Sequence, residues 1–370
     1  MRLPSARGPL SSGVVQALSD PGGRDVAPLV QHVQELPAGT DLLADDDLHL
    51  ALWMLYELHY GGFDGVDPDH EWDPDLLRLR AAMESVVEGE LRARGEPHVR
   101  ATVDAGGPLA ERLFDLAARW EGPSVARYVH RDATRTQFAE LLVHRSIYQL
   151  KESDPQSWVI PRITGKPKAA LVELQYDEYG GGRPERLHAT MFGDAMEGTG
   201  LDRSYGAYLD RVPGYTLANN NVMSLFGLHR RLRGASMGHL GAYEATSSIP
   251  CRKYAGGARR LGLPEQVAAY FDEHVEADAV HEQLAFRDIC AGLVESGQAE
   301  EADVVLGAVA CLLMDNVVGE PMLAAWEAGR SALYDAAAVA VGGAPVAPGA
   351  APADRGAAAA APSSIEKVAS

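Results

Sequence analysis

Apolar residues recur at intervals of three and four along most of the chain, which is the spacing of one face of an α-helix. No segment shows the regular apolar–polar alternation, rich in β-branched side chains, that is typical of strands. The first strong helical run follows Asp45-Asp46-Asp47, where acidic residues favour a helix start, and Gly61-Gly62 ends it. A second helix is predicted from Asp75 to about Arg94. Further helices are predicted at residues 109–120, 134–152, 168–192, 199–209, 217–245, 264–296 and 298–334, so the pattern favours an all-α bundle.

Composition divides the chain into four parts. Residues 1–40 are rich in Gly, Pro and Ser with weak periodicity, so an irregular lead-in is expected there. Residues 41–107 are expected to form an N-terminal helical subdomain, and residues 108–334 the main helical domain. Residues 335–370 consist largely of Ala, Gly and Pro with few large apolar side chains, so this tail cannot build a core and is expected to be disordered.

The charge of the chain excludes some partners. Its 33 basic and 52 acidic residues give a formal net charge of −19, which lacks the basic surface that binds nucleic acid or an anionic membrane. The three cysteines, Cys251, Cys290 and Cys311, fit neither a disulfide framework nor a zinc motif and are interpreted as reduced thiols. The N-terminus has no apolar stretch of signal-peptide length, and the apolar window 304–314 is too short to span a bilayer. We therefore expect a cytoplasmic protein that does not bind a membrane, with 304–314 in a buried helix.

Chemistry-bearing side chains cluster in the segment around residue 278. His274, Asp278 and His281 are spaced i, i+4 and i+7, which places two imidazoles and a carboxylate on one stripe of a helix. Apolar residues continue that stripe, so the three groups face the expected core, where an unpaired charge is costly. A bound iron or manganese ion would compensate them, because imidazole and carboxylate suit these metals. A solvated helix face with incidental histidines is the alternative.

A second segment offers the same ligand types. Glu178, Glu185 and His188 fall at i, i+7 and i+10, on one side of a helix if that helix continues. Glu185-x-x-His188 has the Glu-x-x-His spacing that carboxylate di-iron bundles direct inward. Gly180-Gly181-Gly182 and Pro184 are costly inside a helix, so two helices joined by a loop, with Glu178 separated from the other two, remain the alternative.

A further carboxylate is expected from the helix at 134–152. Glu140 and Glu152 are both available, and Glu152 is preferred because it continues the stripe of Leu141 and Tyr148. His144 on the same helix is another inward candidate, with a satisfied or surface histidine as the alternative.

These residues resemble the heme-oxygenase-like di-iron oxidase superfamily, the iron-containing redox enzymes, over roughly residues 110–330. Members share the fold of heme oxygenase but bind two non-heme irons. The resemblance implies a Glu on the first core helix, a Glu-x-x-His on the second and a His-x-x-x-Asp-x-x-His on a later one; N-oxygenating members add a carboxylate seven residues before the Glu-x-x-His. It thus implies the ligand set Glu152, Glu178, Glu185, His188, His274, Asp278 and His281, with Glu185 as the bridge between the metals.

The resemblance also implies an activity. It indicates an oxidoreductase that uses two Fe²⁺ ions and O2 to oxidise a small amine- or amino-acid-like metabolite, with an external electron donor. Glu178 favours N-hydroxylation; oxidative C–C cleavage or desaturation is the alternative within the family. Nitrosourea-forming members carry a C-terminal cupin domain, whereas this chain ends in the Ala/Pro tail, so nitroso formation is not implied. The competing hypotheses are a cofactor-free or heme-binding member of the same fold, with His144 as the proximal ligand of a heme, and a non-catalytic helical scaffold.

Four other features have two interpretations each. The aromatic face of Trp53, Tyr56 and Tyr60 would either form a homodimer contact or pack against the chain's own main domain. Asn219-Asn220-Asn221 would line a polar pocket or cap a kink, and the basic run 229–233 would bind a substrate carboxylate or pair with the protein's own acids. Glu244 would be either a pocket group or a hydrogen-bonding group at a helix end.

Overall fold

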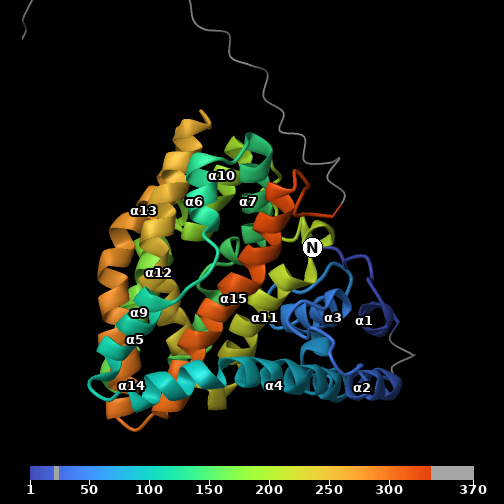
Figure 1. Cartoon of the computed structure of the whole chain (residues 1–370). Coiled ribbons are helices and arrows are strands. Elements are labelled where there is room, and N and C mark those ends of the chain that lie inside the picture. Colours follow the sequence, from blue (N-terminus) through green and yellow to red (C-terminus); the bar gives the residue numbers. More distant parts are fainter. Residues whose placement is uncertain (21–24, 335–370) are drawn as a thin grey trace, which may run out of the picture.

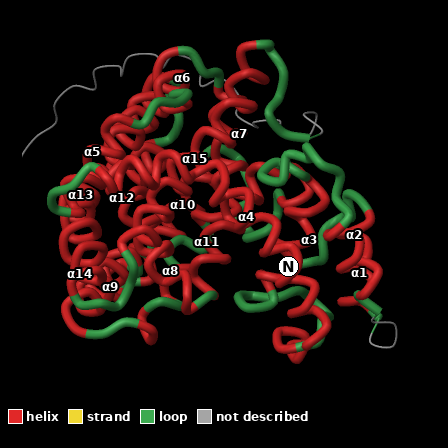
Figure 2. Tube along the Cα trace, turned by 60° about the horizontal axis from the view of Figure 1, so that its bottom comes forward, coloured by secondary structure: helices red, strands yellow, loops and turns green. Residues whose placement is uncertain are grey.

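The structure is a computed structural model that describes residues 1–20 and 25–334, without the side chains of residues 276–280. Every regular element within these ranges is helical, as the hydrophobic pattern predicted (Figure 2). The Ala/Pro-rich tail at 335–370 lies outside the described residues, so the expectation of disorder there stays a prediction.

The N-terminal part contains the four helices α1 (Pro9–Ser19), α2 (Ala27–Gln34), α3 (Asp46–Glu57) and α4 (Pro74–Asp104). The predicted N-cap of α3 is confirmed, since the Asp45 carboxylate accepts a hydrogen bond from the Leu48 amide at 2.8 Å. The expectation of an irregular lead-in is wrong for α1 and α2. Helix α1 forms because Leu10, Val14 and Leu18 supply a buried stripe and the Asp47 carboxylate accepts hydrogen bonds from its first amides.

The main domain is a bundle around the long helix α12 (Arg233–Arg260), which packs against α13 (Glu265–Gln283) and α15 (Glu301–Glu327) (Figure 1). Helices α12 and α15 approach closely at glycines: a Cβ on Gly238 would lie 1.8 Å from the Val304 carbonyl oxygen. The other α-helices are α5 (Leu109–Arg119), α6 (Val125–Arg131), α7 (Arg135–Gln149), α8 (Asp154–Ser157), α9 (Gly165–Glu178), α10 (His188–Gly198), α11 (Gly214–Leu228) and α14 (Gly292–Glu295). A π-helical segment, Leu284–Ala291, joins α13 to α14, and short 3-10 turns cover Pro68–Trp72, Ile160–Arg162, Gly180–Gly182, Pro184–Arg186, Leu209–Arg211 and Arg230–Leu232.

Helix α15 is long and apolar enough to cross a membrane by length and composition, but most of it is buried inside the fold. Its segment from Val304 to Leu312 is buried at every residue, which confirms the prediction of a buried helix there.

Two predicted helices are interrupted. The run expected at 168–192 ends at Glu178 and resumes at His188, because Gly180, Gly181 and Gly182 take φ angles of 68°, 62° and 77° that no right-handed helix contains. The run expected at 217–245 is divided between α11 and α12 by the 3-10 turn Arg230–Leu232. Residues 199–209 do not form the predicted helix and end in the 3-10 turn Leu209–Arg211.

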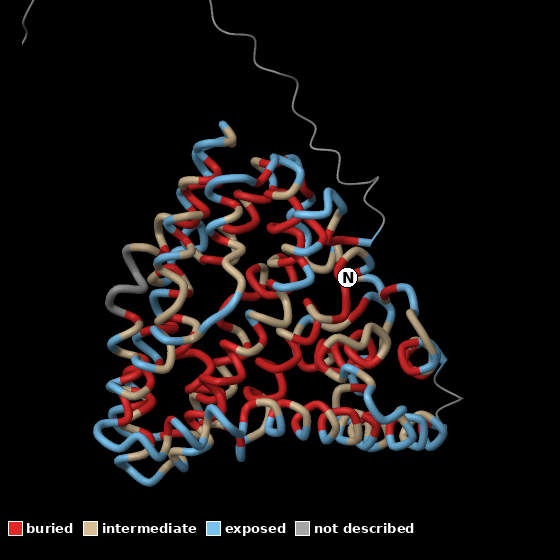
Figure 3. Tube along the Cα trace, in the orientation of Figure 1, coloured by how far each residue is buried: buried red, intermediate tan, exposed pale blue. Residues whose placement is uncertain are grey.

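The N-terminal part joins the main domain through α3, which packs against α11 (Figure 1). Trp53 and Tyr56 are buried inside the chain, and Lys151 lies over the Tyr60 ring and forms a buried ion pair with Glu57 at 3.0 Å. Buried residues also run along the side of α4 that faces the bundle (Figure 3). This packing matches the intramolecular interpretation of the aromatic face, and the homodimer stays a prediction.

Candidate metal centre

One group of potential metal ligands joins three elements. Glu152 follows the C-terminus of α7, His188 opens α10, and His274 lies in α13. All three side chains are buried, and one ligand atom from each lies within 4.8 Å of the others. The turn that carries Glu152 ends at Ser153, whose φ of 70° is unusual for a residue with a side chain and adds local strain beside the site.

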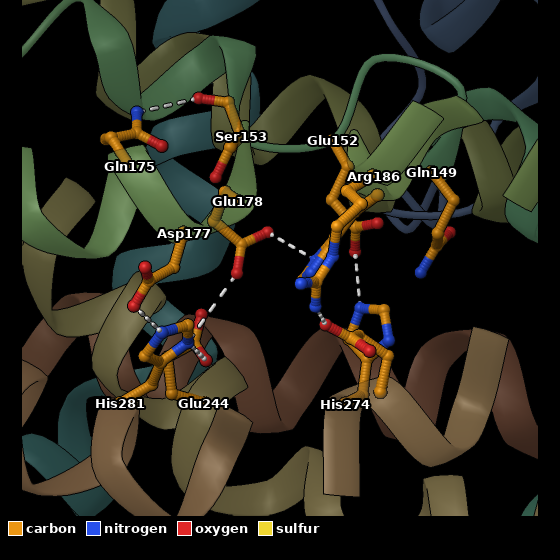
Figure 4. A network of polar contacts seen from close by, with 12 residues as sticks. Gln149, Glu152, Ser153, Gln175, Asp177, Glu178, Arg186, Glu244, His274 and His281 are labelled. Carbon is orange, nitrogen blue, oxygen red and sulfur yellow. Dashed lines mark hydrogen bonds and ion pairs between the residues drawn. The ribbon is translucent and has the colours of Figure 1, made fainter. Parts of the chain in front are cut away.

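A second group lies beside the first. Glu178 ends α9, Glu244 lies within α12, and His281 lies two turns after His274 in α13 (Figure 4). His281 Nδ1 is 3.4 Å from Glu244 Oε2 and 3.6 Å from Glu178 Oε1. These three side chains are also buried.

Glu178 links the two groups. Its Oε1 atom faces His281 in the second group, while its Oε2 atom lies 3.0 Å from Nδ1 of His188 in the first. In Figure 4 its carboxylate stands between the Glu244–His281 side and the Glu152–His274 side. A carboxylate in this position has one oxygen available to each of two cations.

The imidazoles are oriented as ligands. His188 Nδ1, His274 Nε2 and His281 Nδ1 face the carboxylates, and none of the three has a hydrogen-bond partner. The other ring nitrogen is held in two cases, His274 Nδ1 by the Tyr270 carbonyl oxygen at 2.8 Å and His281 Nε2 by the Asp177 carboxylate at 3.3 Å. Such outer contacts orient the ring and leave the inner nitrogen for a metal. Buried imidazole nitrogens that face carboxylates suit divalent iron or manganese.

Residues 139–316 match the family of iron-containing redox enzymes. This segment, 178 of the chain's 370 residues, is similar to that family. The matched segment contains all six residues of the two groups, and the all-helical architecture agrees with a heme-oxygenase-like fold. The nitrosourea synthase of Streptomyces achromogenes subsp. streptozoticus is 26% identical over 220 residues, which cover 59% of this chain and 46% of that protein. The chain therefore matches less than half the length of this relative.

The two groups together place three buried carboxylates beside three buried imidazoles. Burial lowers the pKa of His274, but the nearby Glu152 and Glu178 raise it to about 10. Burial likewise opposes the effect of Glu244 and Glu178 on His281, whose pKa rises to about 9. The metal-free protein thus holds protons on these imidazoles, and a metal ion must displace them.

Most of the predicted ligands meet in these two groups. The structure brings together Glu152, Glu178, His188, His274 and His281, which the sequence analysis had singled out. The Asp278 side chain lies outside the described residues, so its role as a ligand stays a prediction.

The expectation that Glu185 lies in the site is corrected by the fold. Glu185 is exposed in the 3-10 turn Pro184–Arg186 and belongs to neither group. The Glu-x-x-His spacing directs both residues inward only on a continuous helix, and here α10 begins at His188.

Glu244 is the member of the two groups that sequence reasoning did not select, having left it ambiguous between a pocket and a helix-end group. A signal was available, because Glu244 is the one acidic residue in the 28 residues of α12.

Glu140 and Glu152, the two candidate carboxylates, have different partners. Glu140 accepts hydrogen bonds from the Trp326 indole at 2.7 Å and the Ala332 amide at 3.0 Å, which fixes the segment after α15. Glu152 accepts one from the Tyr270 hydroxyl at 3.0 Å and faces His274.

Proposed function

We propose that this protein is a non-heme di-iron oxidase or oxygenase that uses O2 to oxidise a small amine- or amino-acid-like metabolite, with N-hydroxylation as its reaction. The observation that carries the proposal is the pair of buried carboxylate–imidazole groups joined by Glu178. Carboxylate-rich sites of this kind, built between helices of a bundle, are characteristic of di-iron proteins.

Each group would hold one iron. Glu152, His188 and His274 would hold the first, Glu244 and His281 the second, and Glu178 would contact both. Asp278, one helical turn after His274 in α13, would complete the set. Bound ferrous iron supplies the activation of O2.

The chain's own side chains orient the ligands and shape the space beside them. The Tyr270 hydroxyl donates to Glu152, and the Tyr270 carbonyl oxygen holds Nδ1 of His274. A cavity of about 220 Å³ adjoins Glu152 and His274, with Tyr148 and Tyr243 among its lining residues. This size suits a small metabolite, and the aromatic walls limit the water that reaches the site.

Two observations favour oxidation at nitrogen. The second group holds two glutamates, Glu178 and Glu244. Glu178 occupies the position at which the resemblance places the additional carboxylate of N-oxygenating members. The similar nitrosourea synthase is named for a product that contains oxidised nitrogen. N-hydroxylation places one atom of O2 in the new N–O bond and releases the other as water, so two electrons and two protons must come from an external donor.

Iron content and oxygen uptake test this proposal. The metal-free protein, reconstituted with Fe²⁺ without air, should bind about two irons per chain and consume O2 on exposure. His274→Ala and Glu178→Gln should lose iron, whereas Glu185→Gln, at an exposed residue, serves as the matched control. A wild-type protein that binds no iron, or a His274→Ala variant that binds as much as wild type, would overturn the proposal.

With the iron-loaded protein, mass spectrometry under ¹⁸O2 would show which atom of a turned-over amine gains oxygen. Label on nitrogen supports N-hydroxylation. Loss of carbon or of hydrogen without label would assign C–C cleavage or desaturation to the same site.

A further inference from the structure

The N-terminal part of the chain reaches the turn that carries Glu152. The segment that matches the iron-containing redox enzymes begins at residue 139, so helices α1 to α4 lie before it. Helix α3 ends at Glu57, and the Glu57 carboxylate meets the side chain of Lys151, the residue that directly precedes Glu152. This contact joins a helix outside the matched segment to a residue beside a candidate iron ligand.

Lys151 and Glu57 form an enclosed ion pair. Their side chains are 5% and 1% exposed, and Lys151 Nζ lies 3.0 Å from Glu57 Oε2. The Tyr205 hydroxyl donates to the same carboxylate oxygen at 2.9 Å, and the Gly61 amide donates to Oε1 at 3.3 Å. Both oxygens of Glu57 are therefore held, which fixes the direction from which the carboxylate meets the ammonium.

Three aromatic rings surround the same ammonium group. Lys151 Nζ lies 4.1 Å from the centre of the Tyr60 ring, 5.4 Å from that of Tyr205 and 5.7 Å from that of Trp53. A cation is attracted to the faces of such rings, and more strongly where water is excluded. Trp53 and Tyr60 come from α3 and the turn after it, whereas Tyr205 comes from the segment between α10 and α11. These three rings and the Glu57 carboxylate form what we call the lysine cage.

Glu152 depends on a turn for its position, because α7 ends at Gln149. That turn is held on both sides of Glu152. On one side the lysine cage holds Lys151, and on the other the Ser153 carbonyl oxygen accepts a hydrogen bond from Gln175 Nε2 at 3.0 Å. Adjacent residues share a rigid peptide unit, so a shift of Lys151 carries the Glu152 backbone with it.

Stability alone gives no reason for an ion pair at this place. Well-packed apolar residues of similar size often replace a buried ion pair without loss of stability, whereas an ion pair with fixed partners can specify one arrangement of the chain. The lysine cage fits an ammonium group, with a carboxylate on one side and ring faces around it, so it selects one position of Lys151.

We propose that the Glu57–Lys151 pair is a positioning element of the first iron site, through which the N-terminal part of the chain directs Glu152 into the site. The inference rests on the proposed function, since the residue that is positioned belongs to the proposed di-iron ligand set. The end of the Glu152 side chain has contacts of its own, with the Tyr270 hydroxyl at 3.0 Å and His274 Nε2 at 3.6 Å. Those contacts orient the carboxylate, and the lysine cage sets the position of the backbone from which it extends.

Metal titration of full-length variants that keep a single site tests the inference. In Glu244→Gln the first group should retain its ion, and in Glu152→Gln the second group should retain its own. Adding Glu57→Gln and Lys151→Met to each background removes both charges of the pair, so neither is left buried and unpaired. In calorimetric titrations with Fe²⁺ without air, this addition should weaken binding about 10- to 100-fold in the Glu244→Gln background, as is typical when a group that orients a metal ligand is removed. It should leave binding in the Glu152→Gln background unchanged.

A second ion pair of the N-terminal part provides the matched control. Arg80 Nε and Glu84 Oε1 lie 3.2 Å apart on α4, with side chains 14% and 5% exposed, and neither residue adjoins a metal ligand in the sequence. Arg80→Met combined with Glu84→Gln should therefore leave both titrations unchanged. Tyr205→Phe keeps the ring and removes the hydrogen bond to Glu57, so it should weaken binding at the first site about threefold. This smaller change decides the question if the double substitution prevents folding.

The visible absorption spectrum of Co²⁺ bound in the Glu244→Gln background gives an independent readout, because its bands depend on the geometry of the ligands. Glu57→Gln with Lys151→Met should shift these bands, and Arg80→Met with Glu84→Gln should not. Unchanged affinity at the first site in every variant that folds, or equal weakening of both sites, would overturn the positioning role while wild type still binds two irons. A wild-type protein that binds no iron would instead refute the di-iron function.

Discussion

Replacing Glu244 by Gln distinguishes the ligand set in the structure from the one that the sequence suggested. Glu244 Oε2 lies 3.4 Å from His281 Nδ1, and its carboxylate is one of three described donors in the second group. Glutamine keeps the size of the side chain but removes the charge and one strong donor. The exposed Glu185 provides the matched control with the same substitution.

The expected loss of affinity is large. Structural metal sites with four ligands contribute about 10–16 kcal/mol, so one ligand accounts for about 3 kcal/mol or more. That corresponds to at least about a hundredfold weaker binding of one ion. At iron concentrations that just saturate wild type, Glu244→Gln should therefore retain about one iron per chain, while Glu185→Gln should retain about two.

Thermal unfolding measured with and without iron supplies a second readout, because the substitution should affect the melting temperatures of the metal-free and the iron-bound protein differently. Burial and the neighbouring Glu178 raise the pKa of Glu244, so its ionised form is disfavoured in the metal-free protein. The neutral glutamine should leave the metal-free melting temperature unchanged or higher, and lower the increase that iron produces. Full iron loading of Glu244→Gln, or equal destabilisation of both forms, would refute this account of the site.

Buried polar groups away from the two ligand groups also give measurable outcomes. Glu140→Ala leaves the Trp326 indole and a backbone amide without an acceptor. Denaturant unfolding should therefore show a free energy of unfolding that is lower by about 3 kcal/mol, with unchanged iron content. A loss of bound iron would instead mean that Glu140 is a ligand. Lys151→Met leaves the Glu57 carboxylate buried and unpaired, which should cost about 3–5 kcal/mol, and adding Glu57→Gln should recover most of it; a double variant as unstable as the single one would contradict the pairing. Burial lowers the pKa of His239 from 6.5 to about 4, so the folded protein favours the neutral ring. The resulting stabilisation is fully present above pH 6.5 and is lost as the pH falls toward 4. His239→Phe should reduce that acid-induced loss by up to about 3 kcal/mol in unfolding measured from pH 7 to 4, and an unchanged pH profile would show that His239 is not the titrating group.

Local periodicity predicted the parts of the site that lie on one helix. His274 and His281 share a stripe of α13 because their spacing of seven residues is two turns, and no tertiary information is needed to see it. The start of α3 at Asp45 was equally local, since the capping acid precedes the apolar run directly.

Glu244 could not be placed by the same reasoning. It lies 66 residues after Glu178 along the chain and reaches the site only because α12 packs against α13. No periodicity within α12 indicates which neighbouring helix one of its faces will contact. The prediction that Glu185 is the bridge failed for the complementary reason, since it applied helical spacing across a segment that is not a helix.

The glycine segment shows why the break in the predicted helix at 168–192 is part of the site. On a continuous helix, Glu178 and His188 would be separated by ten residues, or about 15 Å along the axis. In the folded chain Glu178 Oε2 lies 3.0 Å from His188 Nδ1, so the backbone must reverse between them. Gly180 permits the reversal: its φ is 68°, and a Cβ there would lie 2.5 Å from the Arg186 carbonyl carbon. The residues that make a long helix costly here are thus the ones that bring the shared carboxylate to the first group of ligands.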